Sequence, residues 1–454
     1  MEETFGRAAG VAMIAQYWLR WSAEHGAPRA ILRWQVRRGD PFAILLSGQR
    51  GLHDPYPLID ELREPGGLLR TPLSYAAFDH PQVRAILRDS RFGVRQALGG
   101  ELPGPWRKLA ERVTVPPNPV EPPSMLVLDP PEHTRMRKPV SSAFTPRAIA
   151  RLRDRVEVVT AELLDAMPAH GSVDLITDFA ARVPIAIIAE MLGFPASDRE
   201  LFLRWGDQVT PLLDIGTSWR SYRGAMVAIE SMDEYLAAHI AKLRREPGED
   251  ILSTLVSSGD LDLRELQAGS SLLMGAGFET TVNLIGNAIA ALSANPDQLA
   301  IAQADPDRWS DVVEETLRFD PPVQTTARQA LEDVEIDGVT VREGGTVILS
   351  LAGANRDPAV FSDPHRFDID RPNLREHVAF SSGIHACLGA SLARMEAVHA
   401  LRALYTRYPD LRLREAPTRR NLFTLHGFEH MPVDLGPVAR TPSPDGLTGA
   451  ALTS

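Results

Sequence analysis

The sequence predicts a mainly α protein: a single large helical domain with a small lobe that contains β-sheet. Three observations support this fold class. Residues 263–294 carry the longest uninterrupted helical pattern of the chain, and residues 147–245 are largely helical by the spacing of their apolar positions. In contrast, residues 334–336, 339–341 and 346–351 are short stretches rich in β-branched side chains, which is typical of strands.

The chain of 454 residues is expected to form one main domain over residues 46–436, because no low-complexity linker interrupts this part. Apolar residues make up 44% of the sequence, so a substantial core can be buried. Residues 1–45 form an N-terminal extension. Residues 437–454 are small, polar and proline-bearing, so we expect a disordered tail. We also expect a monomer.

Charge and cysteine content exclude several classes of protein. Lys and Arg number 48 against 59 Asp and Glu, which leaves a net charge of −11. No global electrostatic attraction to nucleic acid or to anionic lipid is therefore expected, and any basic partner site must be local. A single cysteine excludes an intramolecular disulfide and suits a reducing cytoplasm.

The apolar run of residues 8–19 is about a dozen residues long, short of the roughly 20 that span a bilayer. It also lacks a signal-peptide cleavage pattern. We therefore expect a cytoplasmic protein without a transmembrane anchor.

The N-terminal extension combines tryptophans with arginines, and two interpretations of it remain open. It can form one or two helices that dock their tryptophans on the main body. Alternatively, a basic and aromatic helix can lie on a membrane surface. The side chains concerned are Trp18, Trp21, Trp34, Arg20, Arg29, Arg33, Arg37 and Arg38.

Between the extension and the central helices, the pattern predicts helices over residues 56–62 and 80–91 and a strand-like stretch over residues 68–77. Seven prolines between residues 115 and 131 exclude regular structure and predict a long loop. Loops of this length inside a compact domain are usually functional. A rigid surface connection is the alternative.

The stretch AFSSGIHACLGASLAR contains Cys387, the only cysteine. Gly383 and Gly389 flank it, so the backbone can turn tightly and present the sulfur. A helical pattern begins at Ala390, which places Cys387 at a helix N-terminus. Amide donors and the helix dipole predict a lowered thiol pKa there, and a thiolate binds iron. Taken alone, the residue could equally be an ordinary buried cysteine.

The long helix predicted over residues 263–294 has a plausible capping arrangement at Asp262 and Glu265. Its middle holds two glycines, each of which costs about 1 kcal/mol relative to alanine in a helix. Glu279 follows, and a buried carboxylate is costly unless it is paired or protonated. So many local penalties predict a site, with a kinked core helix as the alternative. A dinucleotide fingerprint is rejected, because no strand precedes the glycines and Thr280 stands at the final position.

His133 and Arg137 follow the proline-rich loop and lie four residues apart, so they share a helix face and could reach one anion. A solvated helix face is the alternative. Basic residues gather around them in an otherwise acidic protein, and we interpret the group as a docking site for an acidic partner. It consists of Arg107, Lys108, Arg135, Lys138, Arg147 and Arg151.

The residues around Cys387 closely resemble the haem-ligand signature of the cytochrome P450 family, the haem-thiolate monooxygenases. The match lies at Phe380, Gly383, His385, Cys387 and Gly389 and in the following Ala-Arg pair. Ser381 and Ser382 stand where the family more often has glycine. The resemblance covers roughly residues 50–435 and implies the cytochrome P450 fold, haem b as cofactor and Cys387 as the metal ligand.

The resemblance also implies roles for other residues. AGFETT resembles the family's oxygen-activating motif, in which a helix is distorted above the haem. Glu279 then corresponds to the proton-relay acid and Thr280 to the hydroxyl that hydrogen-bonds bound O2, and both would be catalytic. Haem propionates would be bound by His133, Arg137, Arg328 and His385, and Ala276 and Gly389 would complete the cofactor site with Cys387.

Further elements have counterparts in the family. Glu315 and Arg318 lie three apart on a helix and can pair; with Arg371 they resemble the family's structural Glu-Arg-Arg network. Val323 and Gln324 would line the substrate pocket, and residues 424–427 match its last turn. The proline-rich loop and the central helices would cover the substrate.

The implied reaction inserts one oxygen atom from O2 into a lipophilic small molecule such as a fatty acid, sterol or polyketide. No flavin or iron-sulfur motif is present, so electrons are expected from a separate ferredoxin and ferredoxin reductase, with the donor docking on the basic group. A non-catalytic haem-thiolate sensor and a peroxide-driven peroxygenase remain alternatives. The acid-threonine pair favours the monooxygenase, because a sensor needs no proton relay.

Overall fold

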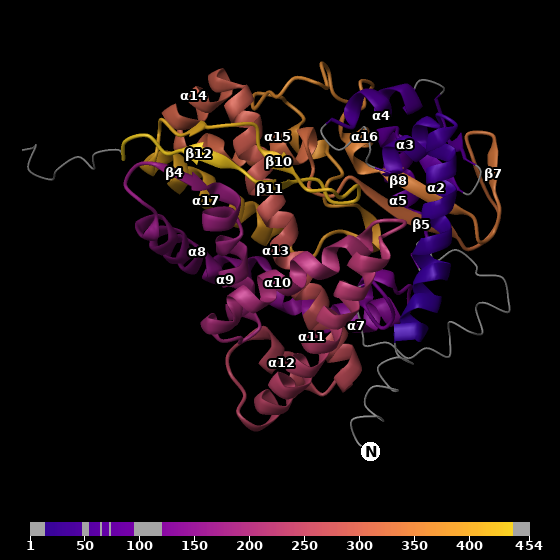
Figure 1. Cartoon of the computed structure of the whole chain (residues 1–454), viewed down its shortest axis with the longest axis horizontal. Coiled ribbons are helices and arrows are strands. Elements are labelled where there is room, and N and C mark those ends of the chain that lie inside the picture. Colours follow the sequence, from indigo (N-terminus) through magenta and orange to yellow (C-terminus); the bar gives the residue numbers. More distant parts are fainter. Residues whose placement is uncertain (1–13, 48–53, 64–65, 72–73, 95–119, 439–454) are drawn as a thin grey trace, which may run out of the picture.

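The computed structural model describes residues 14–47, 54–63, 66–71, 74–94 and 120–438. Helices make up most of it, and Figure 1 shows a small lobe with sheet beside a larger helical body. The prediction of a mainly α fold with a small β-containing lobe is confirmed. The expected disordered tail and the first prolines of the predicted loop lie outside the described residues.

The helices have these bounds: α2 (Ala27–Arg37), α3 (Pro41–Ser47), α4 (Tyr56–Arg63), α5 (His80–Arg88), α7 (Glu132–Ser141), α8 (Pro146–Ala166), α9 (Arg182–Met191), α10 (Arg199–Val209), α11 (Trp219–Arg245), α12 (Ile251–Ser258), α13 (Leu263–Ala294), α14 (Pro296–Ala304), α15 (Trp309–Phe319), α16 (Leu351–Asn355) and α17 (Ala390–Arg407). Residues 14–21 are also helical and continue into α2 through a π-helical turn, Ser22–Gly26. Among the described residues, no helix is long and apolar enough to cross a membrane.

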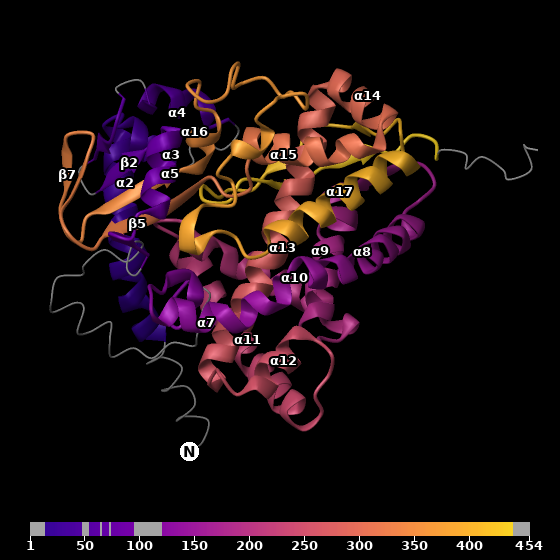
Figure 2. The same ribbon diagram turned by 180° about the vertical axis from the view of Figure 1, so that it is seen from behind.

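Helix α13 crosses the core, as its apolar pattern predicts. It contains 32 residues, or about 48 Å at 1.5 Å per residue. The predicted cap is confirmed: Glu265 N donates to Asp262 Oδ1 at 2.9 Å, and Asp262 N donates to Glu265 Oε2 at 3.0 Å. Helix α17 packs against α8, α13 and α15 (Figure 2). Helix α13 is α-helical throughout, so the distortion that the resemblance implies at residues 275–281 does not interrupt the helix.

The strands are short, with these bounds: β1 (Leu69–Arg70), β2 (Tyr75–Ala77), β3 (Phe92–Gly93), β4 (Ser172–Asp174), β5 (Thr325–Ala330), β6 (Val334–Ile336), β7 (Val339–Val341), β8 (Thr346–Ser350), β9 (Arg412–Leu413), β10 (Thr418–Arg419), β11 (Phe428–His430) and β12 (Pro432–Asp434). The stretch expected as one strand over residues 68–77 therefore holds two, and the helix expected over residues 80–91 ends at Arg88.

The largest sheet has the order β1-β2-β8-β5-β3 and joins early and late parts of the chain. Strand β2 pairs with β8 in parallel, and the other neighbours are antiparallel. Strands β6 and β7 form a hairpin through Asp337-Gly338, which both have positive φ as a two-residue hairpin turn requires. Strand β5 lies between β8 and β3 in the largest sheet, and its residue Arg328 is buried.

The tryptophans of the N-terminal extension do not all lie against the body of the protein, as the docking interpretation expects. Trp21 docks on the body, where Nε1 donates to the Thr217 carbonyl at 2.8 Å. Trp18 and Trp34 do not dock: their side chains are 49% and 51% exposed. Docking therefore accounts for only one of the three tryptophans.

Candidate active site

The loop before α17 presents Cys387. The Cys387 amide donates to the Phe380 carbonyl at 2.9 Å, which closes the loop. Gly383 has φ +74°, and a Cβ there would lie 2.5 Å from the Leu87 carbonyl oxygen, so the close approach to α5 requires glycine. Ser381 also has a left-handed φ of 61°, which explains why glycine suits that position better. Cys387 itself is exposed.

The expected lowering of the Cys387 pKa is wrong for the thiol without metal. Although the residue has an exposed side, desolvation by the neighbouring protein atoms raises the pKa of the Cys387 thiol. The Gly389 amide and the guanidinium groups of Arg137 and Arg394 oppose the shift without reversing it. The thiol form of Cys387 is therefore favoured in the protein without metal, whereas a bound metal ion would deprotonate it.

Four basic side chains meet beside the cysteine loop, and we call them the cation cluster: His133, Arg137, Arg328 and His385. His133 and Arg137 come from α7, Arg328 from β5 and His385 from the loop itself. The imidazole centroids of His133 and His385 are 4.2 Å apart. Arg137 Nη2 donates to the Ala386 carbonyl, next to Cys387. The structure thus brings together all four residues that the sequence proposed for propionate binding.

The cation cluster lacks acceptors for much of its donor capacity. Both ring nitrogens of His133 and Nε2 of His385 are buried and have no hydrogen-bond partner in the described part of the chain. Burial lowers the pKa of Arg328 to about 10, and burial together with the neighbouring cations lowers that of His385 to about 3. Asp129 opposes the shift at His133 and Arg328. Buried cations and orphaned ring nitrogens fit a ligand with two carboxylates, as a haem has.

The remaining expected cofactor contacts border open space. Ala276 is exposed in the middle of α13, and a Cβ on Gly389 would meet no atom within 4 Å. Thr280 lies one turn beyond Ala276, where its Oγ1 donates to the Ala276 carbonyl at 2.9 Å. A sulfur ligand, a dicarboxylate site and an open helix face therefore all fit a haem.

Glu279 is buried next to Thr280 and has a cationic partner that the sequence did not indicate. It is 2% exposed, and Arg420 Nη1 lies 3.3 Å from its Oε1. Arg420 also pairs with Asp207 at 2.8 Å, and the Asp207 side chain is 57% exposed on α10. Burial raises the pKa of Glu279, Arg420 opposes this shift and Asp207 adds to it. The three residues form a charged connection from the surface to the acid.

The last pocket turn packs directly on α13. A Cβ on Gly427 would lie 2.0 Å from Asn283 Oδ1, so only glycine allows this approach. Val323 forms an isolated β-bridge with Leu425. Gln324 is 3% exposed, and its backbone amide donates to the Thr424 carbonyl at 2.9 Å. The two proposed pocket residues are thus joined to the turn that the sequence assigned to the pocket.

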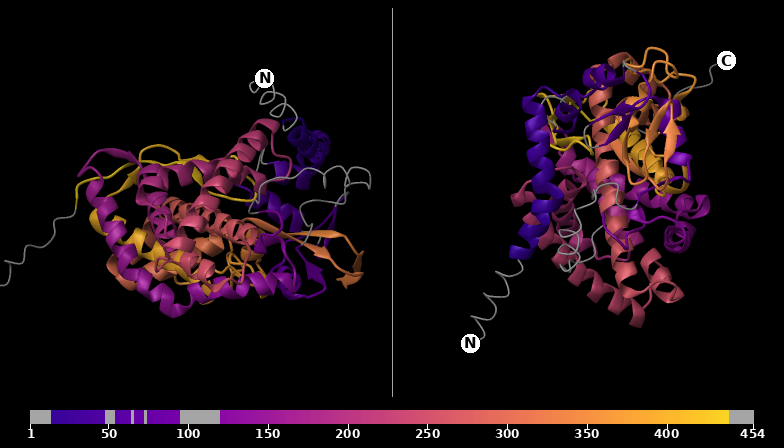
Figure 3. Two further views of the ribbon diagram at one scale, coloured as in Figure 1. Left: turned by 90° about the horizontal axis from the view of Figure 1, so that it is seen from below. Right: turned by 90° about the vertical axis from the view of Figure 1, so that its right-hand side faces the viewer.

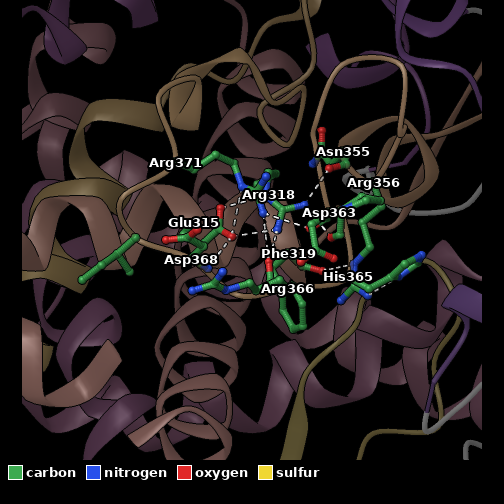
Figure 4. Close-up of polar contacts among 12 residues, drawn as sticks. Glu315, Arg318, Phe319, Asn355, Arg356, Asp363, His365, Arg366, Asp368 and Arg371 are labelled. Atoms are coloured by element: carbon green, nitrogen blue, oxygen red, sulfur yellow. Dashed lines mark hydrogen bonds and ion pairs between the residues drawn. The ribbon is translucent and has the colours of Figure 1, made fainter. Parts of the chain in front are cut away.

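The Glu-Arg-Arg network forms as expected (Figure 4). Glu315 and Arg318 are fully buried and make two hydrogen bonds of 2.7 Å. Arg318 also donates to the backbone carbonyls of Asn355, Pro364 and Arg366 at 2.9–3.1 Å. Arg371 Nε lies 3.5 Å from Glu315 Oε1. The buried Glu315 carboxylate and Arg318 guanidinium therefore both have charged or polar partners.

The group proposed as a docking site is only partly described. Arg107 and Lys108 lie outside the described residues, as does the Arg147 side chain. Arg135 is bound to Glu265, whereas Lys138 and Arg151 are exposed.

A cavity of about 490 Å³ has a basic lining that sequence reasoning missed. Its lining includes Arg153, Arg375, Arg394 and Arg402. It approaches the cysteine loop, because the Arg394 guanidinium lies 4.5 Å from the Phe380 ring centroid.

Arg420, Asp207 and the arginines of this cavity carry no motif and are scattered along the chain, so no spacing could have identified them. Only the packing of α10, of α13 and of the residue that follows β10 brings Asp207 and Arg420 to Glu279. The acid itself stood out because a carboxylate in an apolar helix is unusual.

Comparison with known proteins agrees with this site. The family model "Cytochrome P450" matches residues 309–409. A protein named cytochrome P450 140 from Mycobacterium tuberculosis is 44% identical over 435 residues, covering 94% of this chain and 99% of the relative. The 6-deoxyerythronolide B hydroxylase of Saccharopolyspora erythraea is 42% identical over 316 residues, covering 68% of this chain and 76% of the relative.

Solved structures give the same result. P450BioI, in complex with an acyl carrier protein that bears hexadec-9Z-enoic acid, has a TM-score of 0.79 and 34% identity over 85% of this chain and 99% of that one. Ligand-free CYP164A2 of Mycobacterium smegmatis has a TM-score of 0.77 and 38% identity over 86% and 98%. Since likeness of this degree spans nearly the whole chain, the protein belongs to the cytochrome P450 family of monooxygenases.

Proposed function

We propose that the protein is a cytoplasmic, monomeric haem-thiolate monooxygenase that inserts one oxygen atom from O2 into a lipophilic small molecule. The observation that carries the proposal is the presentation of the Cys387 sulfur beside the cation cluster, in which three buried histidine ring nitrogens have no hydrogen-bond partner among the described residues. Buried cations persist where a ligand compensates them. A haem b meets both needs, with iron at the sulfur and carboxylates at the cations.

The cofactor would be held by residues from four parts of the chain. Cys387 would bind the iron, and His133, Arg137, Arg328 and His385 would donate to the two carboxylates. Ala276 and Gly389 would leave room for the flat ring. When bound through a thiolate, haem supplies the activation of O2.

Glu279 and Thr280 would handle the protons that the reaction needs. Burial raises the pKa of Glu279, so this carboxyl keeps its proton to higher pH than an exposed glutamate does. The Thr280 hydroxyl donates to the Ala276 carbonyl in the structure. After rotating, it would accept a hydrogen bond from the protonated Glu279 carboxyl. Arg420 would position the acid, because it lies 3.3 Å from Glu279 and is itself held by Asp207.

Lipophilic substrates are supported by what related proteins bind. P450BioI was solved with a hexadecenoic acid on its carrier protein, and CYP109E1 from Bacillus megaterium with testosterone. We propose the same broad class here, bound over the face of α13 that exposes Ala276. A ferredoxin, reduced by its reductase, would dock at Lys138 and Arg151 and extend to the basic cavity, where its acidic surface would meet Arg375 and Arg402.

The first experiment is haem reconstitution of the wild type and of Cys387→Ala, with absorption spectra of the reduced carbon monoxide complexes. We expect the thiolate spectrum only in the wild type. Because Cys387 is exposed, the substitution should leave folding intact, which far-UV circular dichroism can verify. A variant with the wild-type spectrum would disprove thiolate ligation by Cys387.

The second experiment separates the three functional classes. A compound library is screened for substrate-induced shifts of the haem absorption, followed by product analysis with a ferredoxin and its reductase. A monooxygenase forms product, and Thr280→Ala lowers the yield of product per electron consumed. A sensor shows spectral shifts without turnover. A peroxygenase works with hydrogen peroxide and is indifferent to charge reversal at Lys138.

A further inference from the structure

The N-terminal helical segment, residues 14–37, attaches to the body through one face. Trp21 Nε1 donates to the Thr217 carbonyl at 2.8 Å, and Arg29 Nη1 donates to the Gly216 carbonyl at 2.5 Å. Both carbonyls belong to the connection between α10 and α11. Figure 3 shows this segment along the outer edge of the molecule in both views. Its other face is therefore available to a partner.

That other face exposes large apolar side chains. Trp18 is 49% exposed, Ile31 38% and Trp34 51%. The segment contributes five of the twelve large apolar residues that are exposed in the described part of the chain, namely Ile14, Trp18, Leu19, Ile31 and Trp34. Scattered single residues of this kind need no explanation, but a cluster on one segment marks an interaction surface.

The same segment carries positive charge in an acidic protein. Arg33, Arg37 and Arg38 are exposed, and none has a carboxylate within salt-bridge distance among the described residues. The Arg38 guanidinium lies 3.8 Å from the Trp34 ring centroid. With a net charge of −11 for the whole chain, this face is a local exception that selects for an anionic surface.

We propose that this segment binds the protein peripherally to an anionic lipid bilayer. Tryptophan is suited to the headgroup region, because its ring is apolar and its N–H is polar. Trp18, Ile31 and Trp34 enter that region, while Arg33, Arg37 and Arg38 pair with lipid phosphates. The combination of exposed tryptophans and unpaired arginines favours a lipid surface over a purely acidic protein, which would not require so much apolar area.

The membrane contact would lie next to the substrate pocket. Asp214, in the same α10–α11 connection, accepts hydrogen bonds from the amides of Phe423 and Thr424 at 2.8 Å each. The segment, the connection and the last pocket turn are thus linked in series. A lipophilic substrate dissolved in the bilayer would reach the pocket over a short path. This consequence depends on the proposed function, whereas vesicle binding does not.

The test is co-sedimentation of the full-length holoprotein with vesicles of phosphatidylcholine, with and without phosphatidylserine. We expect binding to the anionic vesicles that salt weakens. Each arginine near an anionic surface contributes about fivefold, so Arg33→Gln, Arg37→Gln and Arg38→Gln together should weaken binding roughly a hundredfold. Trp18→Ser with Trp34→Ser should weaken it as well, and quenching of tryptophan fluorescence by brominated lipid should be lost.

Matched controls are Arg244→Gln with Arg245→Gln, which remove two exposed arginines elsewhere, and Val227→Ser, which removes an apolar side chain that is 56% exposed. These should bind as the wild type does. Cys387→Ala should also bind normally, which separates this proposal from the haem chemistry. Absence of vesicle binding, or binding that the arginine and tryptophan variants leave unchanged, overturns the proposal. So does binding to a purified acyl carrier protein in place of vesicles.

Discussion

Two regions of the molecule bury guanidinium groups, and they do so in opposite ways. In the Glu-Arg-Arg network, Arg318 is 0% exposed and bonds a carboxylate and three backbone carbonyls. In the cation cluster, Arg328 is 4% exposed, and its hydrogen bonds among the described residues go to the neutral acceptors Thr326 Oγ1 and the Ala327 carbonyl. A buried charge with every donor paired stabilises a fold, whereas one with few acceptors indicates where a ligand belongs.

The largest effect is expected at Glu315→Gln. The substitution preserves the shape of the side chain but leaves Arg318 and Arg371 without their carboxylate in the interior. We expect a loss of about 3–5 kcal/mol in the free energy of unfolding. Urea unfolding of the haem-free protein measures it. A loss below about 1 kcal/mol would show that the carbonyls alone compensate both arginines.

Arg328→Gln tests the removal of a buried arginine that has few partners. Because this arginine has few partners, its loss should leave the stability of the haem-free protein unchanged or raise it. Haem affinity should fall, since a hydrogen bond to a charged group contributes about 1.5–3 kcal/mol, or roughly 10- to 100-fold. Transfer of haem to an acceptor protein measures the affinity. Arg342→Gln is the control, because the Arg342 side chain is 76% exposed; an equal loss of haem there would contradict the assignment.

The raised pKa of Glu279 should make the stability of the protein depend on pH. We expect an effect smaller than that of Glu315→Gln. Burial raises its native pKa above the ordinary value of 4.5, so the native state holds a proton that the unfolded chain has released. Stability therefore falls as pH rises from about 4.5 towards the native pKa, by up to about 1.4 kcal/mol per pH unit. Glu279→Gln should remove this slope.

The charged groups that face Glu279 refine the same prediction. Arg420 favours its carboxylate and Asp207 disfavours it, so Arg420→Gln should extend the falling limb to higher pH. Thermal unfolding between pH 4 and 9, on the single variants and on the double variant with Glu279→Gln, measures the coupling. If Arg420→Gln has the same effect with and without Glu279, the two side chains are not coupled.

The smallest effect is expected at Ser381→Gly. Ser381 has φ 61°, a left-handed conformation that is unfavourable for a residue with a Cβ, and its Oγ is buried without a partner. Glycine should therefore stabilise the protein by roughly 0.5–1 kcal/mol. Ser382→Gly is the matched control, because its φ of −151° is extended and glycine brings no relief there. Equal changes at both positions would contradict the conformational explanation.

Local patterns predicted much of the fold and of the site. Helix α13 has the predicted bounds and cap, and the strands at residues 334–336 and 339–341 are where β-branched residues predicted them. The predictions failed where competing energies decide the outcome. The Cys387 pKa depends on burial as well as on the helix terminus, and α13 accommodates two glycines and two threonines without a break.

By itself, the sequence determined the helical class, the cysteine loop and the identity of the four cations, because short-range spacing and side-chain chemistry are written in consecutive residues. Tertiary structure alone decided that Arg420 and Asp207 meet Glu279, that buried ring nitrogens of His133 and His385 lack partners among the described residues and that one tryptophan of three docks. These outcomes depend on which surfaces pack together and how far each charge is desolvated. Both are properties of contacts between distant segments, which no local pattern records.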